Sequence, residues 1–325
     1  MTRSIVAAAL ALLLAAPVAA ATTPGRNGSI VLGGNTDYKY PSANTSFVME
    51  VDPKTGRVSQ HDLCHPGLVL ERDCRWLSGM AVSPSGEQVA AYTMVQDSIS
   101  GEVVRRGMLR LIDRRDWSVR VVALSCSWCV GPWSTDLSWY PNGSALVASP
   151  QPLRSGTLAP SVLGIFGLAL DGADQGRIAS AGTSAPAWSA QGRLAFIRDG
   201  NLYTARPGEA ERRLTWRGAA TPVWSPHGTW IAFTRCGPER GCDVHVVARD
   251  GGGARRLVRD GYDPAWSPDG RYIAFLRATP PNAVEPGPSL FRLDRRTGRV
   301  RRMTRELVTG YETVGRPQWT TPLPR

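Results

Sequence analysis

A six-residue motif that recurs along the chain limits its possible folds more than any other feature of the sequence. The clearest copy is Ala-Trp-Ser-Pro-Asp-Gly at 265–270. The anchor position, where a tryptophan usually stands, falls at Val82, Trp139, Trp188, Trp224, Trp266 and Trp319. The anchors are 36 to 57 residues apart, and the sequence between them lacks the apolar periodicity of helical repeats. Repeats of this kind are typical of antiparallel propeller blades.

Each repeat contains a pattern of four short strands. The tryptophan ends the first strand, and Ser-Pro-Asp-Gly makes a tight turn in which Pro presets φ and Gly takes a positive φ. After the turn at 267–270 come an apolar second strand (273–275), an alternating third (290–293) and a short basic fourth (301–303). Four strands in each of six repeats predict an all-β fold, a six-bladed β-propeller. We expect the tryptophans to pack between blades, and Asp269 to be a turn residue rather than an ion ligand.

The two ends of the chain indicate how the ring closes. The last anchor, Trp319, lies six residues before the end of the sequence, too late for three further strands. Three unassigned strands near the N-terminus, 29–32, 46–51 and 57–61, have the character of second, third and fourth strands. We therefore expect one composite blade in which the C-terminal strand pairs with these N-terminal strands, which removes two exposed sheet edges.

The first 21 residues have the pattern of a signal peptide. Arg3 precedes an uncharged apolar run at 5–20, and small residues around Ala20 provide a cleavage site. We expect an exported chain, periplasmic or extracellular, in which residues 22–325 form a single propeller domain. We also expect a monomer with no transmembrane segment after signal removal.

The repeat resembles the propeller repeats of the TolB-like family. The resemblance rests on Trp-Ser-Pro-Asp-Gly at 266–270, Ile-Ala-Phe at 273–275 and blade endings such as Arg-Arg-Leu at 255–257. It covers roughly 29–320 and is strongest at 186–277. TolB itself carries an additional α/β domain before its propeller, whereas here we expect the propeller to start directly after the signal. The resemblance implies the propeller architecture and a bias towards protein binding.

Six cysteines in an exported chain indicate disulfides. Short separations favour local pairing on loop-closure grounds, although six cysteines allow about 15 connectivities. The local pairs are Cys64 with Cys74, Cys126 with Cys129, and Cys236 with Cys242. Two alternatives remain open at this point. Cys-Ser-Trp-Cys at 126–129 has the spacing of a redox motif, and His61, Cys64, His65 and Cys74 could together form a metal site.

The predicted topology places the long loops and all three cysteine pairs on one face of the ring. Connections from second to third strand, and from one blade to the next, open on this face. The longest loops predicted there are 33–45, 63–77, 148–160, 279–288 and 306–315. Long loops held by disulfides suit a binding surface, although such loops also vary without any function. The candidate binding residues in or beside these loops are Tyr38, Tyr40, Trp76, Trp128, Trp133 and Tyr311.

The formal net charge of +11 comes almost entirely from arginine, since Lys39 and Lys54 are the only lysines. Arginine pairs fall in or near the predicted outer strands, for example at 212–213, 255–256 and 301–302. Outside the cytoplasm such a rim could meet anionic envelope polymers, phospholipid headgroups or acidic proteins, rather than nucleic acid. A merely solvated rim is the simpler interpretation.

These patterns favour a non-enzymatic scaffold that binds a protein or an anionic envelope polymer through the loop-rich face. We predict no catalytic residue, no cofactor and no metal ligand, since no diagnostic linear motif occurs. The alternative is a propeller enzyme, a hydrolase or lyase with a site at the channel mouth, with or without a divalent cation. A third possibility is a rigid spacer in an envelope assembly. An enzyme predicts carboxylates or histidines that converge on the channel, whereas a binder predicts an aromatic, uncharged-polar loop face.

Overall fold

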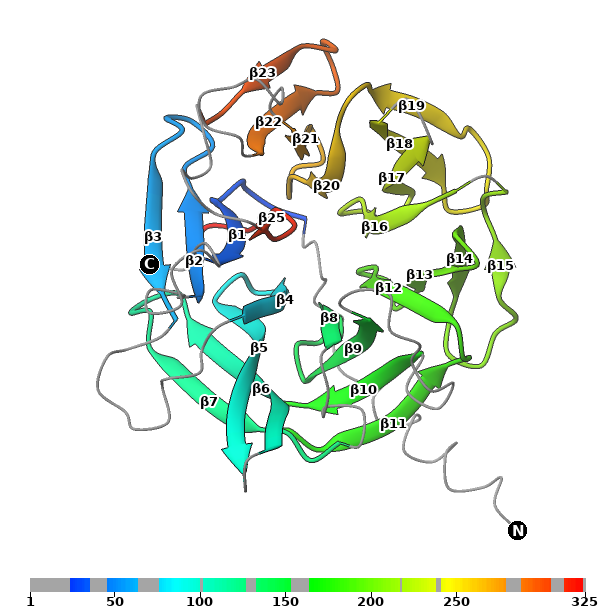
Figure 1. The fold of residues 1–325 in the computed structure, drawn as a ribbon. Coiled ribbons are helices and arrows are strands. Elements are labelled where there is room, and N and C mark those ends of the chain that lie inside the picture. The colour runs from blue at the N-terminus through cyan, green and yellow to red at the C-terminus, as the bar shows by residue number, and fades with distance from the viewer. Residues whose placement is uncertain are drawn as a thin grey trace.

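Six antiparallel sheets surround a central axis in the computed structural model (Figure 1). The structure describes residues 24–35, 46–63, 76–99, 102–126, 133–152, 164–216, 218–237, 241–278, 288–304 and 313–323. All regular elements among these residues are strands. The fold is therefore an all-β six-bladed propeller with four antiparallel strands per blade, as the sequence predicts.

Each blade begins at the axis and ends at the rim. Blade 1 contains β1 (Ile30–Asn35), β2 (Ser46–Val51), β3 (Val58–Asp62), β24 (Thr313–Val314) and β25 (Gln318–Trp319). Blade 2 contains β4 (Trp76–Val82), β5 (Gln88–Ile99), β6 (Glu102–Asp113) and β7 (Val119–Ala123). Blade 3 contains β8 (Trp133–Trp139), β9 (Ala145–Pro152), β10 (Ile165–Ala169) and β11 (Asp174–Ala179).

The second half of the ring repeats this order of four strands per blade. Blade 4 contains β12 (Thr183–Trp188), β13 (Leu194–Arg198), β14 (Asn201–Ala205) and β15 (Arg212–Arg213). Blade 5 contains β16 (Ala220–Trp224), β17 (Trp230–Gly237), β18 (Gly241–Ala248) and β19 (Arg255–Val258). Blade 6 contains β20 (Tyr262–Trp266), β21 (Tyr272–Arg277), β22 (Ser289–Asp294) and β23 (Val300–Arg302).

The composite closing blade is confirmed. The C-terminal strand β25 pairs with β1, with Trp319 opposite Ile30, and β24 pairs with the other end of β1. The Gln318 side chain then joins this blade to β4, because it donates to the Met80 carbonyl and accepts from the Val82 N–H, both at 2.7 Å. The two ends of the described chain thus close the ring.

The anchor tryptophans pack between blades, as expected. Trp139, Trp224 and Trp266 are among the largest fully buried side chains, and each belongs to a hydrophobic cluster shared by two neighbouring blades. The indole N–H of Trp139 donates to the Ala81 carbonyl of the preceding blade at 2.9 Å. Burial of one large ring at five of the six interfaces supplies much of the hydrophobic stabilisation that holds the blades together, while Val82 stands at the blade 1–blade 2 interface.

The Ser-Pro-x-Gly segments are structural turns. In blade 6 the Ser267 hydroxyl donates to Asp269 at 2.6 Å and accepts from the Tyr272 N–H at 2.8 Å, while Gly270 has φ +67°. Asp269 also accepts from the Asn27 side chain at 2.9 Å. Its carboxylate oxygens therefore bind groups of the turn and of the neighbouring blade.

Candidate functional site

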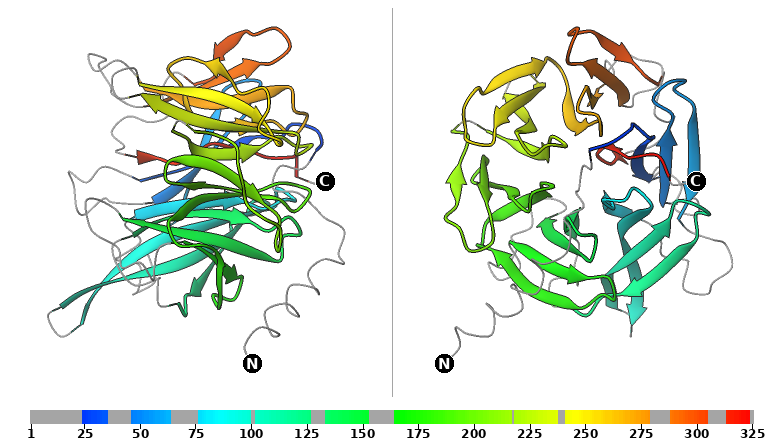
Figure 2. Two further views of the ribbon diagram at one scale, coloured as in Figure 1. Left: turned by 90° about the vertical axis from the view of Figure 1, so that its right-hand side faces the viewer. Right: turned by 180° about the vertical axis from the view of Figure 1, so that it is seen from behind.

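The propeller has two unlike faces. The turn face carries the Ser-Pro-x-Gly turns and the third-to-fourth turns, and the loop-rich face carries the second-to-third hairpins and the connections between blades. The β5–β6 hairpin of blade 2 projects well beyond the disc on the loop-rich face (Figure 2). Each of its strands has 12 residues, and pairing continues to Ile99 opposite Glu102. Beyond Met94 on β5 and Met108 on β6, no described strand pairs with the outer edges of this hairpin.

One position in each blade brings side chains to the loop-rich end of the channel. This position lies three residues before the anchor. Around it, the pairing of the first strand with the second strand shifts in register by one residue in blades 2, 4, 5 and 6. A bulge of this kind turns a side chain away from its regular direction. The six residues at this position, called here the channel ring, are Gly79, Asp136, Ala185, Thr221, Asp263 and Arg316.

The channel ring is conformationally unusual in three consecutive blades. Ala185, Thr221 and Asp263 have φ values of 50°, 48° and 50°, in the left-handed region that non-glycine residues rarely adopt. For Thr221 the branched Cβ makes this conformation more costly still. Strained residues of this kind concentrate at sites where a side chain must be held in one direction.

Charged members of the channel ring from different blades form an ion pair. Arg316 in blade 1 pairs with Asp136 in blade 3, with 2.8 Å between Nη2 and Oδ1. Blade 2 lies between them, and its ring residue is Gly79, where a Cβ would stand 1.6 Å from the Thr135 carbonyl oxygen. Glycine is therefore required there, and the ion pair passes over the position that lacks a side chain.

Asp263 gives the channel ring a second carboxylate. Burial raises the pKa of this carboxyl above its usual value, although the Arg316 charge and a hydrogen bond from Thr221 oppose the shift, and the Asp136 charge adds to it. The backbone N–H of Asp263 donates to the Thr234 hydroxyl at 2.9 Å, which is 2.6 Å from the Thr221 hydroxyl. Two carboxylates and one arginine from three blades therefore interact at one end of the channel.

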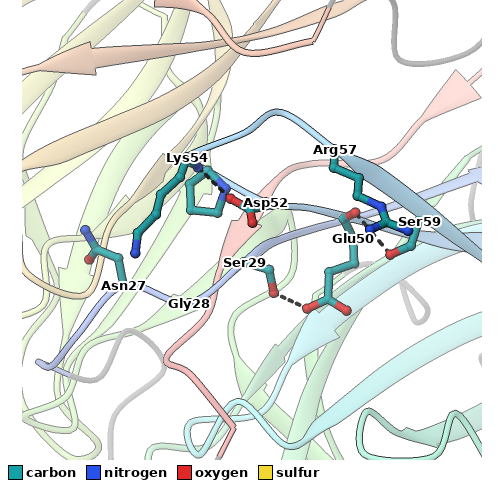
Figure 3. A pocket seen from close by; sticks show the side chains of 9 residues that line it. Asn27, Gly28, Ser29, Glu50, Asp52, Lys54, Arg57 and Ser59 are labelled. Carbon is teal, nitrogen blue, oxygen red and sulfur yellow. Dashed lines mark hydrogen bonds between the residues drawn. The ribbon is translucent and has the colours of Figure 1, made fainter.

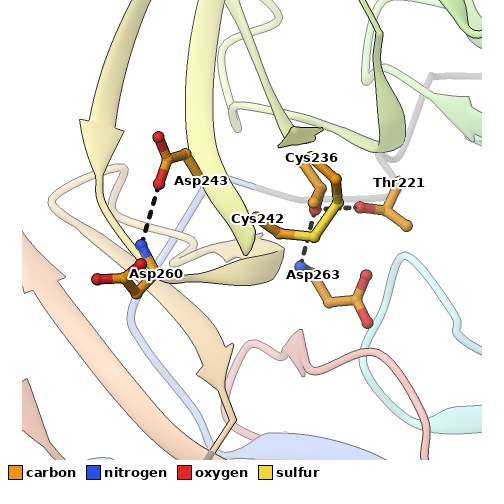
Figure 4. Close-up of a disulfide and its surroundings, with 7 residues drawn as sticks. Thr221, Cys236, Cys242, Asp243, Asp260 and Asp263 are labelled. Carbon is orange, nitrogen blue, oxygen red and sulfur yellow. Dashed lines mark hydrogen bonds between the residues drawn. A yellow bond between two sulfur atoms is a disulfide. The ribbon is translucent and has the colours of Figure 1, made fainter. Parts of the chain in front are cut away.

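A disulfide stabilises the hairpin beside the channel ring. Cys236 and Cys242 are bonded at the end of β17 and the start of β18, close to Thr221 and Asp263 (Figure 4). This predicted pair is confirmed. Cys126 is also disulfide-bonded. The remaining predicted cysteines, Cys64, Cys74 and Cys129, lie outside the described residues.

The alternative metal site of the sequence analysis falls largely outside the described residues, because His65 also lies there. The His61 ring stacks on Trp117 with 3.4 Å between centroids, and burial lowers the His61 pKa. Within the described part of the chain, no group of three or more histidine, cysteine or acidic side chains has the arrangement of a metal site.

The predicted aromatic binding residues stay predictions. Tyr38, Tyr40, Trp128 and Tyr311 lie outside the described residues. Trp76 and Trp133 open β4 and β8, so their backbones stand at the loop-rich ends of two inner strands. The side-chain directions that would bring these six residues together are not part of the described structure.

Sequence reasoning missed an aromatic residue on the loop-rich face. Trp216 lies in the connection from blade 4 to blade 5, and the residue is 69% exposed. Among the tryptophans with described side chains it is the one exposed ring, since the others are buried or half-buried. Arg213 lies over it at 5.7 Å from the ring centroid. The sequence could have indicated this residue, because Trp216 lies between two repeats and is not one of the anchor tryptophans.

Comparison with known proteins identifies the architecture but no close relative. No family model and no curated protein matches the chain. TolB from Acinetobacter baumannii superposes with a TM-score of 0.62 and 16% identity, covering 92% of this chain and 68% of that one. A TolB candidate from Agrobacterium tumefaciens gives 0.59 and 16%, covering 91% and 100%. The fold is that of a TolB-like propeller. The tricorn protease also matches, at 0.52 and 16%, with 90% of this chain and 27% of that chain covered.

These likenesses are in fold, so the site itself must distinguish a scaffold from an enzyme. Within the described residues of this TolB-like propeller, no helix has the length and hydropathy needed to cross a membrane.

The turn face of the TolB-like propeller carries a polar pocket beside the closing blade (Figure 3). Its volume is about 520 Å³, and it is lined by Asn27, Gly28, Ser29, Glu50, Asp52, Pro53, Lys54, Arg57 and Ser59. Glu50 and Ser29 are already held by the buried Arg114 guanidinium, which lies 2.5 Å and 2.8 Å from their oxygens. Backbone N–H groups of Lys54 and Thr55 bind the Asp52 carboxylate and lower its pKa. Most of the polar lining therefore stabilises the blade rather than facing a ligand.

The basic outer strands lie at the rim, as predicted. Arg212, Arg255, Arg256, Arg301 and Arg302 are exposed on β15, β19 and β23. Several of these arginines are used locally: Arg256 pairs with Asp243 at 3.0 Å, and Arg302 donates to the Thr304 carbonyl at 2.8 Å. The rim is thus partly neutralised, and its remaining charge is uneven around the ring.

Proposed function

We propose that this chain is an exported binding scaffold that holds a protein partner on its loop-rich face. Trp216 is the observation that carries the proposal. Exposing a large apolar ring to water is unfavourable, so a partner that covers it gains free energy. Tryptophan is also among the residue types most enriched at the hot spots of protein interfaces. Its place on a rigid propeller means that little conformational entropy is lost when a partner covers it.

The projecting hairpin favours a protein partner over a polymer. The outer edges of β5 and β6 beyond Met94 and Met108 present backbone N–H and C=O groups with no described neighbouring strand. Such edges accept an added strand from another polypeptide.

Export is part of the proposal. The Cys236–Cys242 disulfide is consistent with an oxidising compartment. The signal peptide at 1–21, and residues 22–325 as one monomeric domain, are proposed on the sequence pattern.

Affinity capture from detergent-solubilised envelope tests this function. Wild-type protein, Trp216→Ala and Val300→Ala are used as baits. Val300 is an exposed hydrophobic residue at the turn-face end of β23, so its variant removes a smaller exposed apolar surface from the opposite face. We expect a partner that wild type and Val300→Ala retain and Trp216→Ala loses. Equal retention by all three baits would remove Trp216 from the binding surface.

Asp263 favours a second candidate function, a hydrolase or lyase at the channel mouth. A carboxyl group with a raised pKa, near a second carboxylate that pairs with an arginine, is suited to act as a general acid. The test is turnover of a panel of ester and uronate-polymer substrates. An Asp263→Asn variant that abolishes a detected activity while retaining partner capture would support the enzyme. Absence of turnover across the panel would leave the scaffold.

A further inference from the structure

Positive charge is concentrated in blades 5 and 6. The described residues between 218 and 304 include thirteen arginines and six aspartates, whereas those between 24 and 182 include ten basic and eleven acidic residues. Blades 5 and 6 therefore carry most of the net charge of the described chain. A concentrated field of this kind attracts anions towards one side of the disc.

Two arginines within this region are held by tryptophans on the turn face. The Arg255 guanidinium lies 5.0 Å from the Trp230 ring centroid, and that of Arg295 lies 4.6 Å from the Trp266 centroid. Trp230 and Trp266 belong to one hydrophobic cluster between blades 5 and 6. Arg255 begins β19 and Arg295 follows β22, so both stand at the turn-face ends of neighbouring blades.

Most N–H donors of these two guanidinium groups have no acceptor among the described residues. Arg295 Nη1 donates to the Gly270 carbonyl at 2.8 Å. No other hydrogen bond or ion pair of either guanidinium is found in the described part of the chain. A guanidinium stacked on an aromatic ring uses its π face and leaves its edge N–H donors directed outward.

The nearby carboxylates are engaged elsewhere. Asp294 pairs with Arg271 at 2.7 Å, and Asp250 accepts from the Gly252 N–H at 2.9 Å. Asp269 binds Ser267 and Asn27. Burial, and after it the positive charge of Arg255, lower the pKa of Arg295. The two guanidinium groups thus stack on two rings of one hydrophobic cluster, and neither has a counter-ion among the described residues.

We propose that Arg255 and Arg295 form a phosphate-binding site on the turn face between blades 5 and 6. Two guanidinium groups with outward donors match the charge and the several acceptor oxygens of a phosphate group. The bound anion would relieve the repulsion between the arginines, and the tryptophans keep the entropic cost of ordering them low. This site is separate from the proposed protein-binding face, which lies at the other end of the channel.

The test is calorimetric titration of the purified protein with inorganic pyrophosphate at low ionic strength. The site variant is Arg255→Gln/Arg295→Gln. The matched control is Arg296→Gln/Arg299→Gln, which removes the same charge from two exposed arginines that do not stack on a described aromatic ring. We expect the site variant to weaken pyrophosphate binding about tenfold or more, as loss of charge-assisted hydrogen bonds predicts, while the control changes it by less than about threefold. Equal weakening in both variants, or no binding to wild type, would overturn the proposal.

An Arg255→Lys/Arg295→Lys variant separates geometry from charge and guards against misfolding. It keeps both charges but loses the planar fork, so we expect binding as weak as in the glutamine variant. Lysine variants that bind like wild type would show that diffuse charge suffices, and would contradict a built site. Near-ultraviolet circular dichroism of each variant checks that the tryptophan packing is retained.

A vesicle arm distinguishes the source of the phosphate. Flotation with phosphatidylglycerol vesicles, compared with phosphatidylcholine vesicles, tests a lipid headgroup. If the site variant fails to float with phosphatidylglycerol while the control still floats, the phosphate belongs to a lipid. If wild type binds pyrophosphate but does not float, the site takes a soluble phosphate-bearing ligand. Flotation that both variants lose equally would contradict the proposal for lipid.

Discussion

Arg114 in blade 2 and Arg295 in blade 6 occupy the same position of the repeat and have opposite surroundings. Each follows the third strand of its blade and donates from Nη1 to the carbonyl of the turn glycine, Gly86 or Gly270. Arg114 is buried, with a side chain 2% exposed, and pairs with Glu50 across the blade 1–blade 2 interface. Arg295 is exposed and stacks on Trp266 at the blade 5–blade 6 interface, where Arg255 stacks on Trp230.

The comparison shows how one repeat position serves two purposes. At the closing blade, Glu50 and Ser29 both accept hydrogen bonds from Nη2 of Arg114, and these bonds tie the N-terminal strands to blade 2. In blade 5, Val246 takes the position that Glu50 has in blade 1, and Trp230 takes the position of Ser29. The backbone geometry is retained, while the counter-charge is absent among the described residues. A bound anion can therefore supply the negative charge at the blade 5–blade 6 interface that Glu50 supplies at the blade 1–blade 2 interface.

Glu50→Gln should have the largest effect on stability. It leaves the buried Arg114 charge without its partner, so we expect a loss of about 3 kcal/mol in the free energy of unfolding, measured by urea denaturation. Glu209→Gln is the control, because Glu209 pairs with Arg193 at the surface and should change stability by no more than about 0.5 kcal/mol. If the two variants lose equal stability, the contrast between buried and exposed arginine positions is wrong.

Arg295→Gln should cost much less. The cation–π contact with Trp266 is worth about 1 kcal/mol or less at an exposed site, and removing Arg295 also relieves its repulsion with Arg255. The same urea measurement provides the comparison with Glu50→Gln. A loss as large as that of Glu50→Gln would mean that Arg295 has a stabilising partner, and the anion site would lose its basis.

Asp263→Asn should give the smallest effect, and one that depends on pH. The folded-state pKa of Asp263 is raised above 3.8, so ionisation costs stability as pH rises through the folded-state value. The asparagine variant avoids this cost, and we expect a higher Tm at pH 7, by roughly 2 °C, with no gain at pH 3. Thermal unfolding at both pH values measures it. A lower Tm at pH 7 would show that the Arg316 interaction outweighs burial.

The sequence predicts the fold because its signals are local and repeated. A tryptophan, a Ser-Pro-x-Gly turn and an apolar strand are legible in one copy, and Trp188, Trp224 and Trp266 confirm one another by recurrence. Closure by Trp319 follows from the count of strands. Each of these features acts through neighbours that are close in sequence or equivalent in the repeat.

The channel ring could not be predicted in the same way. Asp136, Asp263 and Arg316 are far apart in sequence, and they interact only because bulges and blade order direct them to one axis. All three stand three residues before an anchor, but the same position holds glycine, alanine or threonine in the other blades, so no recurring residue type marks it in the sequence. The role of Arg295 could not be predicted from the sequence either. Arg114 and Arg295 stand at the same repeat position, and only the structure shows that Glu50 pairs with Arg114 while the Arg255 charge acts on Arg295.

Site-specific photo-crosslinking in the native envelope tests the central claim, that the loop-rich face binds a protein. A photo-reactive amino acid is placed at Ser180 or Arg259, both exposed in blade connections on the loop-rich face, and at Ala254 or Arg296, both exposed on the turn face. The account predicts a discrete protein adduct from Ser180 and Arg259 and none from the two turn-face positions. Adducts from Ala254 and Arg296, with none from the loop-rich face, would contradict it.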